Sequence, residues 1–390
     1  MDLTSGFVIG RIRGIAIRVH WSWLAIFALL AWTLSHELFG GLFPRWSEGQ
    51  QWAAGVATAL LFFLSVLLHE LAHAVVAQRY GMNVPSITLF IFGGVSTLAE
   101  EMKSPGEEFR VAIAGPLMSW ALAAGCGLLW LVTRGVEVSA IPGYLAVINV
   151  VLGTFNLLPG FPLDGGRVLR SAVWARTDDL LRATRVAARA GTAIAYVMIS
   201  GGLAVIFFFG LLNGLWYVLI GFFLRSAAEG AYGSLRLQMV LRDVATSAVM
   251  RESPQPVHAA LSLERLVEER VLPQGERAFL VEREGAVVGL VTVGDVTRVP
   301  RSEWPATPVE AAMVPSERVV TVSPQTRVIE ALRLMREHDV RQLPVLLDGR
   351  VAGMLTRDDV MRHIELRMAL DGDGGDARAD GGRADEGAGR

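Results

Sequence analysis

The chain has 390 residues, of which 52% are hydrophobic, and its mean hydropathy is +0.42. This is too apolar for an ordinary soluble enzyme and indicates several membrane spans. The net charge of −2 gives no indication of a nucleic-acid partner, and the single cysteine, Cys126, excludes a disulfide framework or a cysteine-based zinc site. Long runs almost free of ionisable groups fill the first 230 residues. The remainder is ordinary in polarity, so we expect a membrane part followed by a soluble part.

Six apolar runs in the first part are long enough to cross a bilayer, whose hydrocarbon core takes roughly 20 helical residues. Arginine is concentrated before the first run, between the second and third, between the fourth and fifth, and after the sixth. Because positive residues favour the cytoplasmic side, this pattern predicts a multi-pass protein of the cell membrane with cytoplasmic N- and C-termini. The predicted spans are residues 19–38, 52–78, 110–133, 141–160, 186–209 and 211–228.

The second predicted span contains a His-Glu-x-x-His motif, formed by His69, Glu70 and His73. On a helix the two histidines lie one turn apart on the same face, so both imidazoles can bind one metal ion. Glu70 is rotated from them by about 100° and can accept a proton from a metal-activated water. The alternative is a chance match. Ionisable groups deep in an apolar helix are costly to bury without partners, which favours the metal site.

A third ligand is expected at the end of the fourth predicted span, because catalytic zinc sites use three protein ligands and a water. This segment runs Asn156-Leu-Leu-Pro-Gly-Phe-Pro-Leu-Asp164-Gly-Gly. Its prolines and glycines predict irregular backbone, which is tolerated at membrane depth only where it is buried or lines a cavity. Asp164 could then face the metal, and Asn156 could donate a hydrogen bond to the developing oxyanion. The alternative for Asp164 is an ordinary turn aspartate at the membrane surface.

The combination of His69-Glu70-x-x-His73 with Asn156…Leu-Asp164-Gly-Gly resembles the site-2 protease family of intramembrane metalloproteases, in its six-span bacterial and archaeal branch with CBS domains. The resemblance implies one Zn²⁺ bound by His69, His73 and Asp164, with Glu70 as general base. It also implies cleavage within the transmembrane segment of a single-span regulatory protein, such as an anti-sigma or pro-sigma factor. Two alternatives from other classes are a CBS-regulated transporter and an inactive scaffold. Glu70→Gln separates them, because only a protease would lose cleavage while keeping zinc.

Residues 84–98 form a run of β-branched and aromatic residues whose apolar stretch is too short to span the membrane. The run predicts a re-entrant strand or a hairpin bent at Gly93-Gly94. An edge strand here could pair with an unwound substrate segment by β-addition. The family resemblance implies the same role and a second strand between Gly10 and His20. The alternative is that the run only packs between helices.

The soluble part contains an internal repeat, because the stretch Val287–Arg298 recurs as Val351–Arg362 with Thr and Asp at matching positions. Each unit is too small to bury a core alone, so the two should pack together. The pattern resembles a tandem pair of CBS domains, which leaves a homodimer through these domains open. The resemblance implies an adenine nucleotide, ATP or AMP, held by Thr292, Asp295, Thr356 and Asp359. A compatible alternative is that both aspartates are helix N-caps, where Asp is favoured.

The expected fold class is therefore a polytopic α-helical membrane protein with a re-entrant β element, followed by a cytoplasmic α/β tandem of CBS domains. The composition of the C-terminal residues, mostly Asp, Gly, Ala and Arg, predicts a disordered tail. The predicted boundaries are 1–230 for the membrane metalloprotease domain, 231–242 for a linker, 243–300 and 307–366 for the two CBS domains, and 367–390 for the tail.

Overall fold

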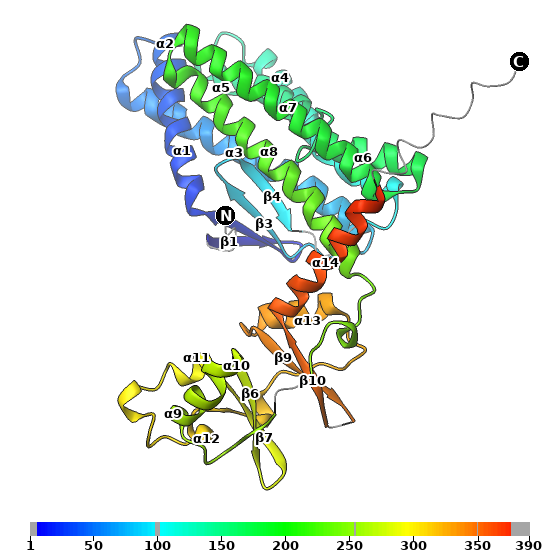
Figure 1. The fold of residues 1–390 in the computed structure, drawn as a ribbon. Coiled ribbons are helices and arrows are strands. Elements are labelled where there is room, and N and C mark those ends of the chain that lie inside the picture. Colours follow the sequence, from blue (N-terminus) through cyan, green and yellow to red (C-terminus); the bar gives the residue numbers. More distant parts are fainter. Residues whose placement is uncertain (1–5, 98–101, 253–254, 349, 376–390) are drawn as a thin grey trace, which may run out of the picture. The chain divides into compact units, whose positions relative to one another are not determined.

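The computed structural model describes residues 6–97, 102–252, 255–348 and 350–375. The chain divides into two compact units, Met1–Leu235 and Arg236–Arg390, and each has its own core (Figure 1). The first unit holds long helices and one small sheet. The second holds two short sheets with short helices around them.

Five helical segments of the first unit are long and apolar enough to cross a membrane, counted over the described residues. They correspond to the first five predicted spans, so the chain is a multi-pass membrane protein with five candidate spans. The sixth predicted span, 211–228, falls in α8 (Leu211–Leu241), which is not among the five, and it stays a prediction. The five segments are Trp21–Leu42 (α1, Trp21–Thr33, a π-helical turn and α2, Gly40–Leu42), Glu48–Arg79 (α3), Pro105–Val132 (α4), Glu137–Asn156 (a 3-10 turn and α5, Ala140–Asn156) and Leu180–Phe209 (α7).

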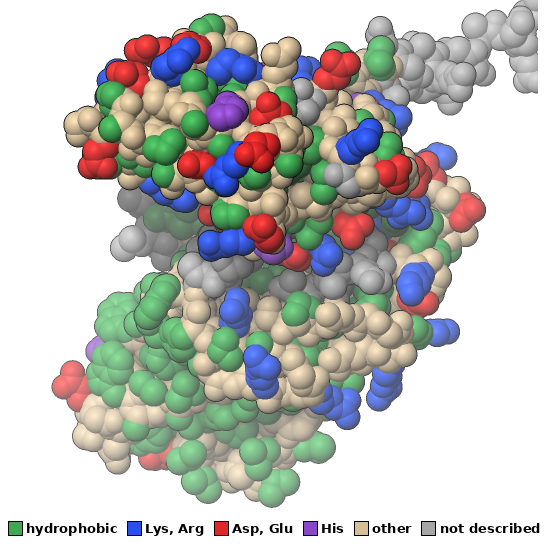
Figure 2. Space-filling view, turned by 90° about the horizontal axis from the view of Figure 1, so that it is seen from below, with side chains coloured by type: hydrophobic (Ala, Val, Ile, Leu, Met, Phe, Trp, Pro, Cys, Tyr) green, Lys and Arg blue, Asp and Glu red, His purple; other side chains and the backbone are tan. Residues whose placement is uncertain are grey.

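The long helices begin at polar caps and expose apolar side chains along their lengths. The Ser47 hydroxyl accepts the N–H of Gln50 at the start of α3, and Ser104 caps α4 in the same way. Large side chains such as Val132 and Phe207 remain 84% and 83% exposed. A membrane explains this exposure, because lipid replaces water around a spanning helix. Figure 2 shows hydrophobic side chains crowded over one region of the surface and charged side chains over another.

A four-stranded sheet belongs to the same unit, with strand order β1-β2-β3-β4. β2 and β3 are parallel, and the other neighbours are antiparallel. β4 (Gly93–Thr97) is last in the strand order and is therefore an edge strand. The predicted hairpin is present, but the prediction of its bend is wrong. The turn is made by Ile91 and Phe92, and Gly93 and Gly94 begin β4. Gly93 has a φ of 128°, which glycine adopts without strain. The other strands are β1 (Gly6–Ile12), β2 (Ile15–His20) and β3 (Ser86–Phe90).

A non-helical segment connects α5 to α6 (Asp164–Thr177), at the position where the prolines and glycines predict irregular backbone. The connecting residues pack on α7, where the N–H of Phe161 donates to the carbonyl of Ala187 over 3.1 Å. A Cβ on Gly191 would lie 1.9 Å from the carbonyl oxygen of Phe161, so only glycine permits this approach. Leu163 is the N-cap of α6, which makes Asp164 its first helical residue.

The second unit contains two hairpins, each followed by a helix, in agreement with the internal repeat. In the first repeat, β6 (Ala278–Arg283) and β7 (Ala286–Thr292) lead into α11 (Val293–Val296). In the second, β9 (Gln342–Leu347) and β10 (Arg350–Thr356) lead into α14 (Arg357–Gly375). The other strands and α-helices are β5 (Val257–His258), β8 (Val314–Pro315), α9 (Leu263–Leu266), α10 (Leu272–Gln274), α12 (Val309–Ala312) and α13 (Val328–Glu337).

Two segments expected to be irregular are partly helical. Residues 231–241, most of the predicted linker, belong to α8. Residues 367–375 of the predicted tail belong to α14, and residues 376–390 lie outside the described part of the chain. The domain boundaries drawn from the sequence therefore stay predictions.

Candidate metal centre

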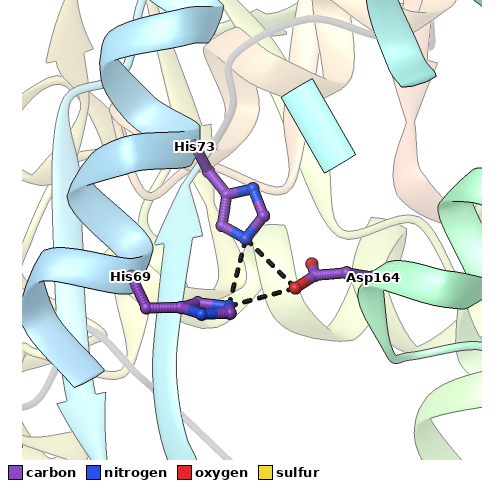
Figure 3. A group of neighbouring side chains, drawn as sticks. All are labelled: His69, His73 and Asp164. Atoms are coloured by element: carbon purple, nitrogen blue, oxygen red, sulfur yellow. Dashed lines mark hydrogen bonds and ion pairs between the residues drawn. The ribbon is translucent and has the colours of Figure 1, made fainter. Parts of the chain in front are cut away.

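Two helices bring three ligand-type side chains together, His69 and His73 from α3 and Asp164 from the start of α6 (Figure 3). Asp164 Oδ2 lies 3.0 Å from His69 Nε2 and 3.2 Å from His73 Nε2, and the two Nε2 atoms are 3.3 Å apart. Both histidines are buried, and the Asp164 side chain is 15% exposed. Residues far apart in the sequence thus direct three Lewis-base atoms at one point.

The spacing of these three atoms suits a tetrahedral zinc site. Bonds of about 2.0–2.1 Å to a tetrahedral ion set neighbouring ligand atoms about 3.3 Å apart. The three separations, 3.0, 3.2 and 3.3 Å, are close to that length. Two imidazoles and one carboxylate are also a donor set of catalytic zinc, which keeps its fourth position for water. The residues present therefore fit Zn²⁺.

The outer nitrogens of both imidazoles are held by α4. His73 Nδ1 lies 2.7 Å from the carbonyl oxygen of Val111, and His69 Nδ1 lies 2.9 Å from Ser119 Oγ. A carbonyl oxygen only accepts, so Nδ1 of His73 carries the proton and donates it. In the neutral ring, Nε2 then keeps its lone pair for the cluster. Such outer hydrogen bonds fix the tautomer and the orientation of metal-binding histidines.

Gly115 of α4 gives the two imidazoles room to converge. A Cβ at this position would lie 2.2 Å from His73 Nε2 and 2.6 Å from His69 Nε2. Both separations are far below van der Waals contact, so any side chain would displace the rings. The same helix therefore holds the outer nitrogens of both rings and accommodates their inner nitrogens.

Glu70 lies beside the cluster on α3 and contacts the edge strand β4. The Ser96 hydroxyl donates to Glu70 Oε2 over 2.8 Å. A Cβ on Gly94 would lie 2.4 Å from Glu70 Cγ, so the strand and the side chain are closely packed. Gly94 and Ser96 lie two residues apart and share one face of β4. The residue predicted to be the general base is thus oriented by the sheet.

Asn156 has a local partner in this structure. It is the last residue of α5, and its Nδ2 donates to the carbonyl oxygen of Leu152 over 3.0 Å, one turn earlier in the helix. Within the described part of the chain, no hydrogen bond joins Asn156 to the three converging side chains. Its predicted role at the oxyanion stays a prediction.

The four residues predicted to hold a nucleotide form two equivalent turns in the second unit. The Thr292 hydroxyl donates to Asp295 Oδ2 over 2.7 Å, and the Thr356 hydroxyl donates to Asp359 Oδ2 over 2.6 Å. Each aspartate N–H donates back to its threonine Oγ1. Thr292 is the N-cap of α11 and Asp295 is its third residue, so the alternative that the aspartates are N-caps is wrong. Thr356 and Asp359 form the same pair of bonds at the start of α14. The nucleotide role stays a prediction.

Sequence reasoning missed the α4 and β4 residues that orient the site. Val111 acts through its backbone, and Gly115 and Ser119 look like ordinary small residues in an apolar helix. One signal was available, because Val111, Gly115 and Ser119 recur at intervals of four and so share one face of the helix. Nothing in that spacing says which side chains the face meets.

Comparisons with known proteins agree with this site. The model of peptidase family M50 matches residues 57–140 and 132–199, and the CBS domain model matches residues 309–366. The chain is 37% identical to Rip3 of Mycobacterium tuberculosis over 92% of each chain. It is 33% identical to sll0528 of Synechocystis over 93% of this chain and 96% of that protein. Both relatives are named as zinc metalloproteases.

A solved structure, the site-2 protease from Methanocaldococcus jannaschii, is also similar. It is 28% identical and covers 58% of this chain and 95% of its own, with a TM-score of 0.44. The converging ligands, the long apolar helices and the two relatives together define an intramembrane zinc metalloprotease, an enzyme class that takes membrane proteins as substrates. The chain belongs to peptidase family M50, the site-2 protease family, and residues 309–366 of its C-terminal part match the CBS domain model.

Proposed function

We propose that this protein is a zinc endopeptidase that cleaves the transmembrane segment of a single-span regulatory protein of the anti-sigma or pro-sigma type. The observation that carries the proposal is the convergence of His69 Nε2, His73 Nε2 and Asp164 Oδ2 within 3.3 Å of one another. Two of these atoms come from a helix that is apolar and long enough to span the membrane. The substrate class rests on the family resemblance.

His69, His73 and Asp164 would hold the zinc ion through these three atoms. When bound, the ion acidifies a water molecule and polarises the scissile carbonyl. Glu70 takes the proton of the attacking water on its carboxylate and delivers it to the leaving amine. The hydrogen bond from Ser96 to Oε2 keeps the carboxylate oriented for both transfers.

Asn156 is proposed to stabilise the oxyanion. Its amide has two N–H groups, and one of them is used by the carbonyl oxygen of Leu152. The other is free to donate to the substrate oxygen as negative charge develops there.

The edge strand β4 is proposed to bind unwound substrate. A peptide bond inside a helix is shielded, so the cleaved segment has to be extended, and an extended segment can add to a sheet edge. β4 suits this role because it has one neighbour, β3, and because its Ser96 and Gly94 contact Glu70. Substrate paired with β4 would lie next to the general base.

The two edges of the sheet allow a matched test of substrate pairing. A photo-crosslinking residue is placed at Val95 in β4 or at Val8 in β1, each in the Glu70→Gln enzyme so that substrate is retained. We expect a crosslinked membrane protein from the β4 position and none from the β1 position. Equal capture at both edges would remove the role assigned to β4.

The protease assignment is tested by Glu70→Gln with Glu37→Gln as its matched control, since Glu37 is exposed and lies in another span. Membranes containing each variant are compared by quantitative proteomics for truncated single-span proteins, and zinc is measured in the purified full chain. We expect Glu70→Gln to lower cleavage about 10²–10⁴-fold and to keep one zinc per chain. A transporter or scaffold would give the same fragments in wild-type, Glu70→Gln and Glu37→Gln membranes.

The CBS pair is proposed to be cytoplasmic, to comprise residues 243–300 and 307–366, and to bind ATP or AMP through Thr292, Asp295, Thr356 and Asp359. The support is the recurrence of one Thr–Asp turn in both repeats. A nucleotide could regulate cleavage only if its affinity differs between two states of the enzyme. Isothermal titration of the full chain with ATP, ADP and AMP tests binding, with Thr356→Ala as the variant that should weaken it. Light scattering of the same sample tests whether the chain forms a homodimer, which the resemblance to CBS domains left open.

A further inference from the structure

One face of α4 contacts both histidines and the helix that carries Asp164, without supplying a ligand itself. Glu108, Val111, Gly115 and Ser119 follow one another at intervals of three or four, so they form a single stripe along the helix. Three of them meet the histidines, as the distances to His69 and His73 show. The fourth, Glu108, points to the other helix of the site, α6.

Glu108 is fully buried and is paired with arginines of α6. Its Oε1 accepts a hydrogen bond from Arg170 Nε over 2.6 Å and also contacts Arg170 Nη2. Arg167 Nε lies 3.8 Å from the same oxygen. The Glu108 side chain is 0% exposed and that of Arg170 is 7% exposed, so water screens this pair little.

The arginines connect this ion pair to Asp164. Arg167 and Arg170 follow Asp164 within the next two turns of α6, which begins at Asp164. The Arg170 guanidinium also lies 5.3 Å from the centre of the Phe161 ring, in the segment that leads into Asp164. Arg170 follows Asp164 in α6, and its side chain contacts both α4 and Phe161, which precedes Asp164.

We propose that α4 is the template of the metal centre and that Glu108 with Arg170 is the positioning pair that holds Asp164 in register with the two histidines. The charge-assisted hydrogen bond from Arg170 to Glu108 Oε1 is directional, whereas apolar side chains alone would let α6 slide along α4. The stripe then fixes all three ligands from one rigid element, two by hydrogen bonds and one through an ion pair. This inference rests on the proposed zinc ligands.

The test uses the full chain in detergent, stripped of metal and titrated with Co²⁺, whose visible absorption reports a tetrahedral site. The variants are Glu108→Gln, Arg170→Gln and the double variant. The matched control is Glu107→Gln, the same change one residue earlier, where the side chain accepts the exposed Lys103 backbone N–H over 3.2 Å. We expect Glu108→Gln and Arg170→Gln to weaken Co²⁺ binding about 10- to 100-fold, and Glu107→Gln to leave it unchanged. The double variant should cost less than the product of the two single effects.

A purely structural role is separated by thermal unfolding with and without the metal. Loss of positioning shrinks the increase in Tm that Co²⁺ produces, whereas general destabilisation lowers both Tm values equally. If Glu108→Gln does not fold, Glu108→Asp and Arg170→Lys replace the two single variants, because each keeps its charge and changes only the geometry. Unchanged Co²⁺ affinity and spectrum in the folded variants would overturn the inference. Failure of the wild-type chain to bind Co²⁺ would instead remove the proposed metal site itself.

Discussion

The metal centre and the Thr–Asp turns of the second unit use aspartate in opposite ways. Asp164 meets two imidazole nitrogens from another helix, so three electron-pair donors face one another. Asp295 and Asp359 instead accept hydrogen bonds from a threonine in their own turn. A second oxygen in each is paired with an arginine, Arg298 or Arg251. The groups around a carboxylate, more than its sequence motif, therefore decide whether it stabilises the start of a helix or is suited to bind a cation.

Removal of the metal should give the largest difference between the two regions. Treatment with 1,10-phenanthroline, or the substitution His73→Ala, is expected to abolish cleavage, because a site with two remaining ligands holds zinc poorly. The second unit should keep its amide hydrogen-exchange protection, since its Thr–Asp turns contain none of the three proposed ligands. His36→Ala is the matched control, because His36 is an exposed histidine bonded to the Trp32 carbonyl in another span. Elemental analysis should find zinc in the control and none in His73→Ala.

The next largest effect is expected at Gly115, which separates crowding from loss of a ligand. Gly115→Ala places a methyl group on the two Nε2 atoms and should weaken zinc binding about 100-fold. Gly125→Ala is the control on the same helix, since a Cβ there has nothing within 4 Å. Zinc retention during dialysis against graded chelator measures both. Equal retention in the two variants would mean that the histidines can yield to the methyl group at little cost.

Loss of one orienting hydrogen bond should have a smaller effect. Ser119→Ala leaves His69 Nδ1 without its partner at 2.9 Å, so the ring is less well oriented, and zinc affinity should fall about 10-fold. Thr133→Ala, the control, removes a hydroxyl at the end of the same helix that bonds the Leu129 carbonyl. The same chelator assay compares them. If Ser119→Ala keeps the wild-type affinity, the packing of α4 orients His69 without the hydroxyl.

The sequence was sufficient to predict which three side chains converge, but it was insufficient to identify the residues that orient them. His69 and His73 could be paired because helical spacing is known in advance, and Asp164 could be added because the broken helix end was visible. Val111 and Gly115 could not be assigned, because a carbonyl oxygen and a missing Cβ acquire meaning only when a partner helix is in place. Gly93 and Gly94 were assigned to the bend for a similar reason. In the structure Gly93 is needed for its φ of 128°, and Gly94 is needed because Glu70 packs against it. Both requirements arise from tertiary structure, so the local sequence does not reveal them.

The smallest effect is expected from the caps of the second unit, and it sharpens the contrast with Asp164. Thr292→Ala removes the hydroxyl that both donates to Asp295 and accepts its N–H, which should lower the free energy of unfolding of this part by about 1 kcal/mol. Thr356→Ala should cost about as much, because its turn has the same bonds. Thr297→Ala is the control, since its exposed hydroxyl bonds the Gly294 carbonyl and takes no part in the Thr–Asp turn. Hydrogen exchange of residues 286–296 and 350–360 reports the loss, and zinc content should be unchanged throughout. Loss of zinc in either cap variant would show that the two regions are coupled, and their stabilities could then no longer be treated as independent.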